Sequence, residues 1–210
     1  VDMVENRFST NLLMSKSFEG ANMKSVVLSL FFLSLLVSPA WAGSFSLDFN
    51  DYSTQLGFAQ KLNTQTYGDT IAKVRYLYND DSRTNLAGVA VGVIGTPGNV
   101  DGLNLGIDVA LNGGETEADQ EVLALGLGFL AEYAPPALRG FGFDGHLIYS
   151  PEIFTFLDSE DYIEWGVGAS YQVLPTARVT LAFQNIQIDF KNRNGFDLDE
   201  TVRFGISFDF

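Results

Sequence analysis

The feature that most constrains this chain is an alternation of bulky apolar and small residues that recurs from Gly43 to the last residue. In "EVLALGLGFL", Leu123, Leu125 and Leu127 fall on one face of an extended strand, while Gly126 and Gly128 fall on the other. A period of two residues is typical of β-strands, and we find no convincing stretch with the period of a helix. The sequence therefore predicts an all-β fold.

The alternating segments number about ten, and most are about ten residues long. That length crosses a bilayer when a strand is tilted. The first two segments could form one bent strand, but the resulting odd count would place the chain ends on opposite sides. We therefore predict an antiparallel transmembrane β-barrel of about ten strands, with eight as the alternative count. The expected strands are 44–50, 55–62, 68–79, 86–94, 102–112, 121–133, 140–150, 161–173, 177–190 and 200–210.

The composition of the two strand faces decides between a membrane barrel and a soluble β protein. A soluble sandwich fills its solvent face with residues such as Lys, Thr and Glu. In "GVAVGV" and "LNLGIDVAL", Val, Leu and Ile occupy one face of the strand, and the other face holds mainly Gly and Ala with occasional charged residues. This favours a bulky face toward lipid and a small face toward a narrow interior. A soluble lipocalin-like barrel, with its apolar face inward, is the alternative.

The N-terminal part predicts export. Met23 and Lys24 precede an apolar run from Val26 to Val37, and the small residues Ala40 and Ala42 follow at the spacing of a signal-peptide cleavage site. The run is too short for a membrane-spanning helix, which needs about 20 residues. We interpret 23–42 as a cleaved signal peptide, 43–210 as the barrel, and 1–22 as an upstream extension that is not native. The expected location is the outer membrane of a Gram-negative cell envelope.

Charge and composition exclude several functions. The formal net charge of −14 argues against a nucleic-acid partner. There is no cysteine and only one histidine, so thiolate and multi-histidine metal sites are excluded. The acidic segments "GETEADQE" and "DLDE" could bind Ca²⁺ weakly, as extracellular carboxylate loops do, but they lack the ligand spacing and turn glycine of a dedicated calcium loop, which favours plain solvated loops. We expect no metal and no cofactor.

Alternate connections should lie on opposite sides of the membrane. Those near 51–54, 80–85, 113–120, 151–160 and 191–199 hold most of the loop acids, whereas those near 63–67, 95–101, 134–139 and 174–176 are shorter on average. The first set is expected outside the cell, and both termini in the periplasm. Aromatic residues are expected at both rims, as in membrane barrels. They are Tyr76, Tyr78, Tyr149, Trp165 and Phe190 at the outer rim, and Tyr133, Phe141, Tyr171, Phe208 and Phe210 at the periplasmic rim.

Charged residues at inward positions predict a filled lumen. Ten strands enclose an interior only slightly wider than that of eight, which side chains just fill. Opposite charges in this space should pair and bridge it. We therefore expect a narrow porin-like passive pore for small solutes with a largely plugged lumen. A non-conducting structural or surface-interaction barrel is the alternative. The predicted lumen charges are Lys73, Arg75, Asp108, Glu132, Asp144, His146, Glu164 and Arg203.

The final segment, "RFGISFDF", must pair with the first strand, because an open edge in lipid leaves backbone groups without partners. It resembles the β-signal that the bacterial barrel-assembly machinery reads. Arg203, Gly205, Phe208 and Phe210 match that signal. The expected partners are thus outer-membrane lipid, the assembly machinery and periplasmic chaperones.

Several short motifs resemble the YfaZ family of predicted outer-membrane proteins. They are "LAGVAVGV" after the acidic "NDD", "YSPE" at the end of a strand, "GVGASYQV", and the aromatic final strand. The resemblance covers nearly all of 43–210 and implies a porin-like outer-membrane barrel without an established substrate. It implies no catalytic residues.

One constellation deserves weighing as an enzyme site. Asp144, His146 and Ser150 share one face of "GFDGHLIYS". A serine nucleophile must lie within hydrogen-bond reach of the imidazole, but four residues along a strand span about 13 Å. We therefore expect polar lining of the lumen here and no enzyme activity.

Overall fold

The computed structural model describes residues 42–66, 68–98, 100–116, 120–191 and 193–210. The predicted extension and all of the signal peptide except Ala42 lie outside the described residues. The strands are β1 (Gly43–Phe49), β2 (Ser53–Gln65), β3 (Gly68–Asn79), β4 (Thr84–Gly95), β5 (Leu103–Glu115), β6 (Glu121–Tyr133), β7 (Phe141–Ser150), β8 (Thr155–Leu157), β9 (Ser159–Leu174), β10 (Ala177–Phe190) and β11 (Arg193–Asp209). Short 3₁₀ turns, η1 (Pro136–Leu138) and η2 (Glu152–Phe154), precede β7 and β8. Within the described residues, no helix is long and apolar enough to cross a membrane.

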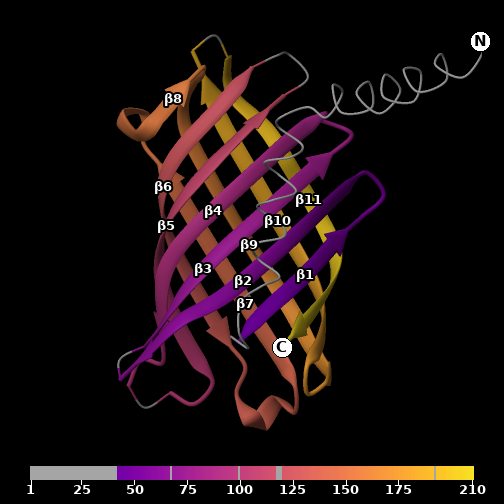
Figure 1. Ribbon diagram of the computed structural model, residues 1–210. Helices are drawn as coiled ribbons and strands as arrows, with labels where there is room; N and C mark the ends of the chain where they lie inside the picture. Colours follow the sequence, from indigo (N-terminus) through magenta and orange to yellow (C-terminus); the bar gives the residue numbers. More distant parts are fainter. Residues whose placement is uncertain (1–41, 67, 99, 117–119, 192) are drawn as a thin grey trace, which may run out of the picture. The chain divides into compact units, whose positions relative to one another are not determined.

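The strands close into an antiparallel barrel (Figure 1). Each of its strands pairs with the next along the chain, and β1 pairs with β11. Two hydrogen bonds between the main chains of Gly43 and Phe210, at 2.8 and 2.9 Å, tie the ends of this closing pair. The three-residue β8 pairs only with β6, so ten strands form the ring. The prediction of ten strands is confirmed, and the alternative count of eight is wrong.

Several strands are longer than predicted because their ladders continue past the expected turns. In β5 and β6 the pairing reaches Glu115 and Glu121, and in β10 and β11 it reaches Phe190 and Arg193. The predicted loop 191–199 is therefore largely strand, and the first three residues of the predicted loop 113–120 belong to β5. The predicted loop 151–160 contains η2, β8 and the start of β9. Its local pairing with β6 forms a lobe beside the barrel (Figure 1).

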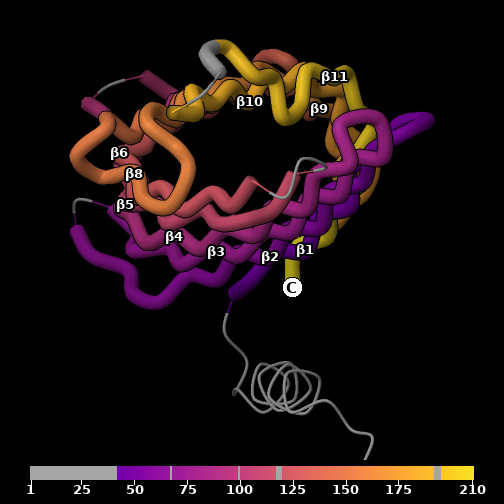
Figure 2. Tube along the Cα trace, turned by 90° about the horizontal axis from the view of Figure 1, so that it is seen from above, coloured from indigo at the N-terminus to yellow at the C-terminus, as the bar shows by residue number. Residues whose placement is uncertain are grey.

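The barrel has two distinct ends. The "terminal end" carries Gly43, Phe210 and the connections β2–β3, β4–β5, β6–β7 and β9–β10, and the "loop end" carries the other connections (Figure 1). Figure 2, which looks along the barrel from above, shows β2 to β5 forming the wall opposite β9 to β11. Side chains on β3 and β9 can thus meet across the lumen.

The outer surface of the barrel is apolar. Ile107, Leu127 and Val91 are 62%, 62% and 54% exposed, whereas their inward neighbours on the same strands are small or polar. This is the reverse of a soluble protein, whose large apolar side chains lie inside. Aromatic residues lie on the outer surface toward both ends, as predicted, with one exception. Phe190 is only 1% exposed and points into the barrel.

An apolar cluster fills the lumen at the loop end. Its side chains come from the loop-end halves of six strands and are 0 to 2% exposed. We call it the plug; its members are Leu77, Leu86, Val122, Ala124, Tyr162, Ile186, Ile188, Phe190 and Leu198. The alternation pattern predicted small residues with occasional charges inside, so this apolar layer is an addition to the predicted lumen.

Candidate functional site in the barrel lumen

The centre of the lumen is crossed by an ion pair between Arg75 on β3 and Glu164 on β9. In the ring of ten strands, four strands separate β3 from β9 in either direction, so the pair joins opposite walls. Both terminal nitrogens of Arg75 donate to the two carboxylate oxygens of Glu164. Glu164 is fully buried. A bidentate pair of this kind fixes geometry as well as charge.

Glu164 is the hub of a wider network. The hydroxyl of Tyr162 donates to its Oε2 at 2.5 Å, and the amide of Gln184 donates to its Oε1 at 3.2 Å. His146 Nε2 lies 3.1 Å from the same Oε1. Arg75 also donates to Asn112 Oδ1 at 2.9 Å. Side chains from four strands thus contact one carboxylate, and Arg75 links a fifth strand through Asn112, which makes a polar layer directly below the plug.

A second ion pair joins this layer from the closing strand. Arg203 Nη1 donates to the side-chain amide oxygen Oε1 of Gln184 at 3.0 Å, and the amide nitrogen Nε2 of Gln184 in turn donates to Glu164. Arg203 Nη2 lies 2.6 Å from Asp199 Oδ1, an ion pair by distance that lacks hydrogen-bond alignment. Arg203 is 3% exposed and Asp199 1%. The residue that the sequence assigned to both the lumen and the β-signal is therefore fully inside the barrel.

Asp199 was missed by sequence reasoning. The prediction placed it in a loop, but the β10–β11 ladder continues past it and shifts register between Ile186 and Gln187. This irregularity leaves Leu198 and Asp199 both buried, although they are adjacent. The side-chain amide of Asn79, at the end of β3, donates to Asp199 Oδ1 at 2.8 Å. A bulge of this kind has no clear signature in the alternation pattern.

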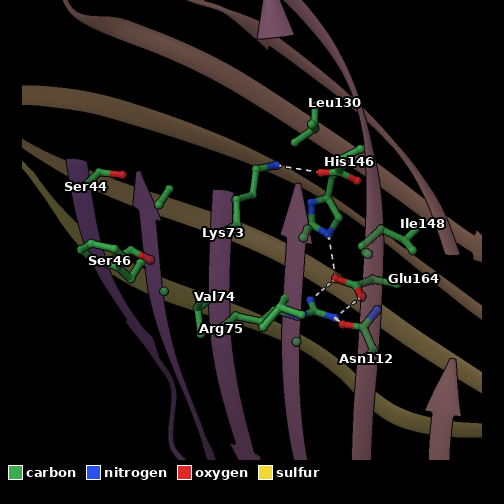
Figure 3. A pocket seen from close by; sticks show the side chains of 18 of the residues that line it. Ser44, Ser46, Lys73, Val74, Arg75, Asn112, Leu130, His146, Ile148 and Glu164 are labelled. Atoms are coloured by element: carbon green, nitrogen blue, oxygen red, sulfur yellow. Dashed lines mark hydrogen bonds and ion pairs between the residues drawn. The ribbon is translucent and has the colours of Figure 1, made fainter. Parts of the chain in front are cut away.

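A further ion pair lies closer to the terminal end, where Lys73 Nζ is 3.0 Å from Asp108 Oδ2. Together with His146 they line a cavity of about 250 Å³ beneath the Arg75–Glu164 pair (Figure 3). Figure 3 shows Lys73 and Arg75 reaching from one strand toward His146 and Glu164. Ser44 and Ser46 of β1 complete the polar part of the wall.

The remaining predicted lumen charges lie at the mouth of the terminal end. Glu132 and Asp144 are directly paired positions of β6 and β7, and both are solvent-exposed. They line a second cavity of about 430 Å³ together with Arg178. The structure thus places them at the mouth and not in the central part of the lumen, because β6 and β7 reach the end of the barrel there. Asp48 of β1 is a further inward carboxylate, near Thr180, that sequence reasoning did not select.

The residues weighed as an enzyme site do not converge. Ser150 is fully buried and donates to the carbonyls of Leu125 and Phe154 at 2.8 and 3.2 Å. His146 faces Glu164 instead. The serine hydroxyl is engaged at the loop end, while the imidazole lies beside the central cavity.

Glycines make room for the charged side chains. Asp108 pairs in register with Gly92 on one side and Gly128 on the other, and Arg75 likewise lies between Gly57 and Gly88. A Cβ atom on Gly128 would overlap the Asp108 carboxylate, with the Asp108 Cγ only 2.9 Å away. The small inward face is therefore the space into which the longer side chains fold.

We expect Gly128→Leu to destabilise the barrel by about 1–3 kcal/mol, because overpacking displaces Asp108 from Lys73. Ala131→Leu, an exposed position on the same strand, is the matched control and should change little. Guanidinium unfolding in detergent, followed by tryptophan fluorescence, measures both. Equal stability of the two variants would contradict the assignment of Gly128 as room for Asp108.

Comparison with known proteins gives one family. A family model described as "YfaZ precursor" matches residues 23–210. None of the curated proteins searched matches this chain. Among solved structures, a chain from work on the in-meso crystallization of membrane proteins is 12% identical, with a TM-score of 0.44 over 80% of this chain and 83% of that one. The outer-membrane channel DcaP of Acinetobacter baumannii is 10% identical, with a TM-score of 0.45, and the match covers 83% of this chain and 60% of that chain. The KdgM porin is 10% identical, with a TM-score of 0.39, and the match covers 80% of this chain and 99% of that chain.

Proposed function

This chain belongs to the YfaZ family, and from that membership and the apolar outer surface of its barrel we propose that it is a porin-like protein of the bacterial outer membrane with a plugged lumen. The terminal end faces the periplasm and the loop end faces outward. The barrel is a narrow passive pore whose resting state is closed to all but small solutes. It carries out no catalysis.

The plug is the observation that carries this proposal. Among the described residues, its side chains are at most 2% exposed, and the ion-paired layer lies directly beneath it. Water and ions cross an apolar constriction of this kind poorly, because hydration is lost without replacement. Conduction therefore requires the plug side chains to move.

Export and assembly follow the same proposal. The chain crosses the inner membrane with its signal peptide, is carried by periplasmic chaperones, and is inserted by the barrel-assembly machinery. The aromatic final strand, closed against β1, supports this route. Outer-membrane lipid then covers the apolar belt.

Planar-bilayer recording tests the closed lumen. Wild-type protein should show little or no conductance, and Leu77→Ala should raise it, because Leu77 is a fully buried member of the plug. Leu111→Ala removes the same atoms from a side chain that is 40% exposed on the outer surface, and should leave conductance unchanged. A large, stable wild-type conductance that Leu77→Ala does not alter would overturn the proposal.

Surface labelling tests the orientation. An epitope inserted between Glu115 and Glu121, in the β5–β6 connection, should be labelled on intact cells, while one within 134–138, in the β6–β7 connection, should be labelled only after permeabilisation. The reverse result would invert the topology. Recovery of the protein in a soluble periplasmic fraction would favour the lipocalin-like alternative.

A non-conducting surface barrel is the second candidate function. The lobe formed by η2 and β8 favours it, since Ile153 is 75% exposed and Phe154 and Phe156 are 46% and 48% exposed at the loop end. Apolar groups exposed in this way often mark contact surfaces. If Leu77→Ala and wild type are both silent in bilayers, this function replaces the pore.

A further inference from the structure

The lobe formed by η2 and β8 is apolar, unlike the acidic connection between β3 and β4. Its exposed side chains include Ile153, Phe154 and Phe156, and Glu152 is the only charged residue of η2 and β8. The β3–β4 connection, by contrast, is the polar sequence Asp-Asp-Ser-Arg at 80–83. Apolar side chains exposed together on one part of a surface usually mark a contact with a partner or with lipid.

We propose that this lobe lies in the outer leaflet of the membrane and contacts the acyl chains of the surrounding lipid. The inference rests on the proposed function, because it takes the barrel to span the outer membrane with its loop end outward. It adds to that function a lipid-contacting segment outside the ring of ten strands.

The lobe continues the apolar outer surface of the barrel. β7 pairs with β6 only as far as Leu127, and β8 takes its place beside β6 at residues 122–124. Within that pairing Phe156 is in register with Leu123, which lies on the same outward face of β6 as Leu127. Paired positions in a sheet share a face, so the Phe156 ring extends the surface that faces lipid.

The lobe also projects sideways from the barrel near its rim. Figure 1 shows the turn from η2 to β8 standing out beyond the wall formed by β5 and β6, and Figure 2 shows β8 at the same edge of the barrel. A segment that projects sideways from a transmembrane barrel lies over the surrounding lipid and not over the pore. Aromatic side chains such as Phe154 and Phe156 favour this level of a bilayer.

The main chain of the lobe is suited to a place with little water. The hydroxyl of Ser159 donates to the Phe156 carbonyl at 2.8 Å, and Lys191 Nζ donates to the Leu157 carbonyl at 2.7 Å. The Asp158 carbonyl accepts from the main-chain nitrogen of Lys191 at 3.2 Å. A loop in water leaves such carbonyl groups to the solvent, whereas lipid offers them no donor. These contacts therefore allow the turn after β8 to lie at the edge of the hydrocarbon.

Site-specific fluorescence tests the proposal, because the chain has no cysteine and a single introduced one takes the label. Ile153→Cys, carrying the fluorophore NBD, is folded into phosphatidylcholine vesicles whose lipids bear a nitroxide either near the headgroup or deep in the acyl chain. The shallow nitroxide should quench this label severalfold more than it quenches a label on Asp81→Cys, in the acidic β3–β4 connection. Phe156→Cys should behave like Ile153→Cys and serves if that variant does not fold.

Ile107→Cys, at the centre of the outward-facing run on β5, is the membrane control, and the deep nitroxide should quench its label most. If the label at Ile107 is quenched by lipid while that at Ile153 responds only to a water-soluble quencher, the inference is wrong and the proposed function stands. A label at Ile153 that neither lipid nor water reaches would also overturn the inference, in favour of the contact surface of the second candidate function. If lipid quenches no position, the proposed membrane barrel itself fails.

Discussion

Replacing Glu164 with leucine is expected to lower the free energy of unfolding by about 3–5 kcal/mol, the usual cost of removing one partner from a buried ion pair. Arg75 would keep its charge in the lumen without its bidentate acceptor. Tyr162 and Gln184 would lose the same acceptor. Guanidinium unfolding of the barrel in detergent or vesicles measures the loss.

The double variant Arg75→Met with Glu164→Leu separates the pair from its surroundings. Removing both charges eliminates the unpaired charge, so this variant should recover much of the stability that either single variant loses. A strongly non-additive cycle is the expected result. Additive losses from the two single changes would show that the two side chains act independently, contrary to their position across the lumen.

Replacing Phe210 with serine is expected to reduce the folded protein in the membrane severalfold. Phe210 is 66% exposed on the outer surface, and its ring lies 6.2 Å from that of Phe58 beside the closing pair. Loss of this aromatic removes both the contact at the closing strands and the last residue of the predicted assembly signal. Heat-modifiable migration on gels measures the folded fraction.

Asp209→Ser is the matched control, because it changes the adjacent residue, whose side chain is half exposed on the other face of the strand. This variant should assemble normally. Normal accumulation of folded Phe210→Ser protein would contradict the assembly-signal prediction. Equal loss in both variants would indicate a general requirement for an intact C-terminus.

The inward positions of Lys73, Arg75, Asp108 and Glu164 could be predicted because side chains alternate across a strand. Their partners could not. Arg75 meets Glu164 only because the ring has ten members and places β3 opposite β9, which depends on strand count and closure. Asp199 was misplaced for a related reason, because a register shift and a ladder longer than expected turned it into the barrel. Phe190 was assigned to the outer rim, although alternation along β10 places it on the same inward face as Gln184 and Ile186.

The sequence by itself determined the all-β class, the apolar outer surface and the closure of β11 on β1, because each depends on a local period of two and on the demand of lipid for paired backbone groups. Only the tertiary structure decided how the lumen is filled. An inward leucine such as Leu77 and an inward glycine such as Gly88 follow the same alternation, so the pattern cannot tell a plug from a cavity. Their heights along the barrel, set by tilt and register, put the apolar side chains together at the loop end and leave polar space toward the termini.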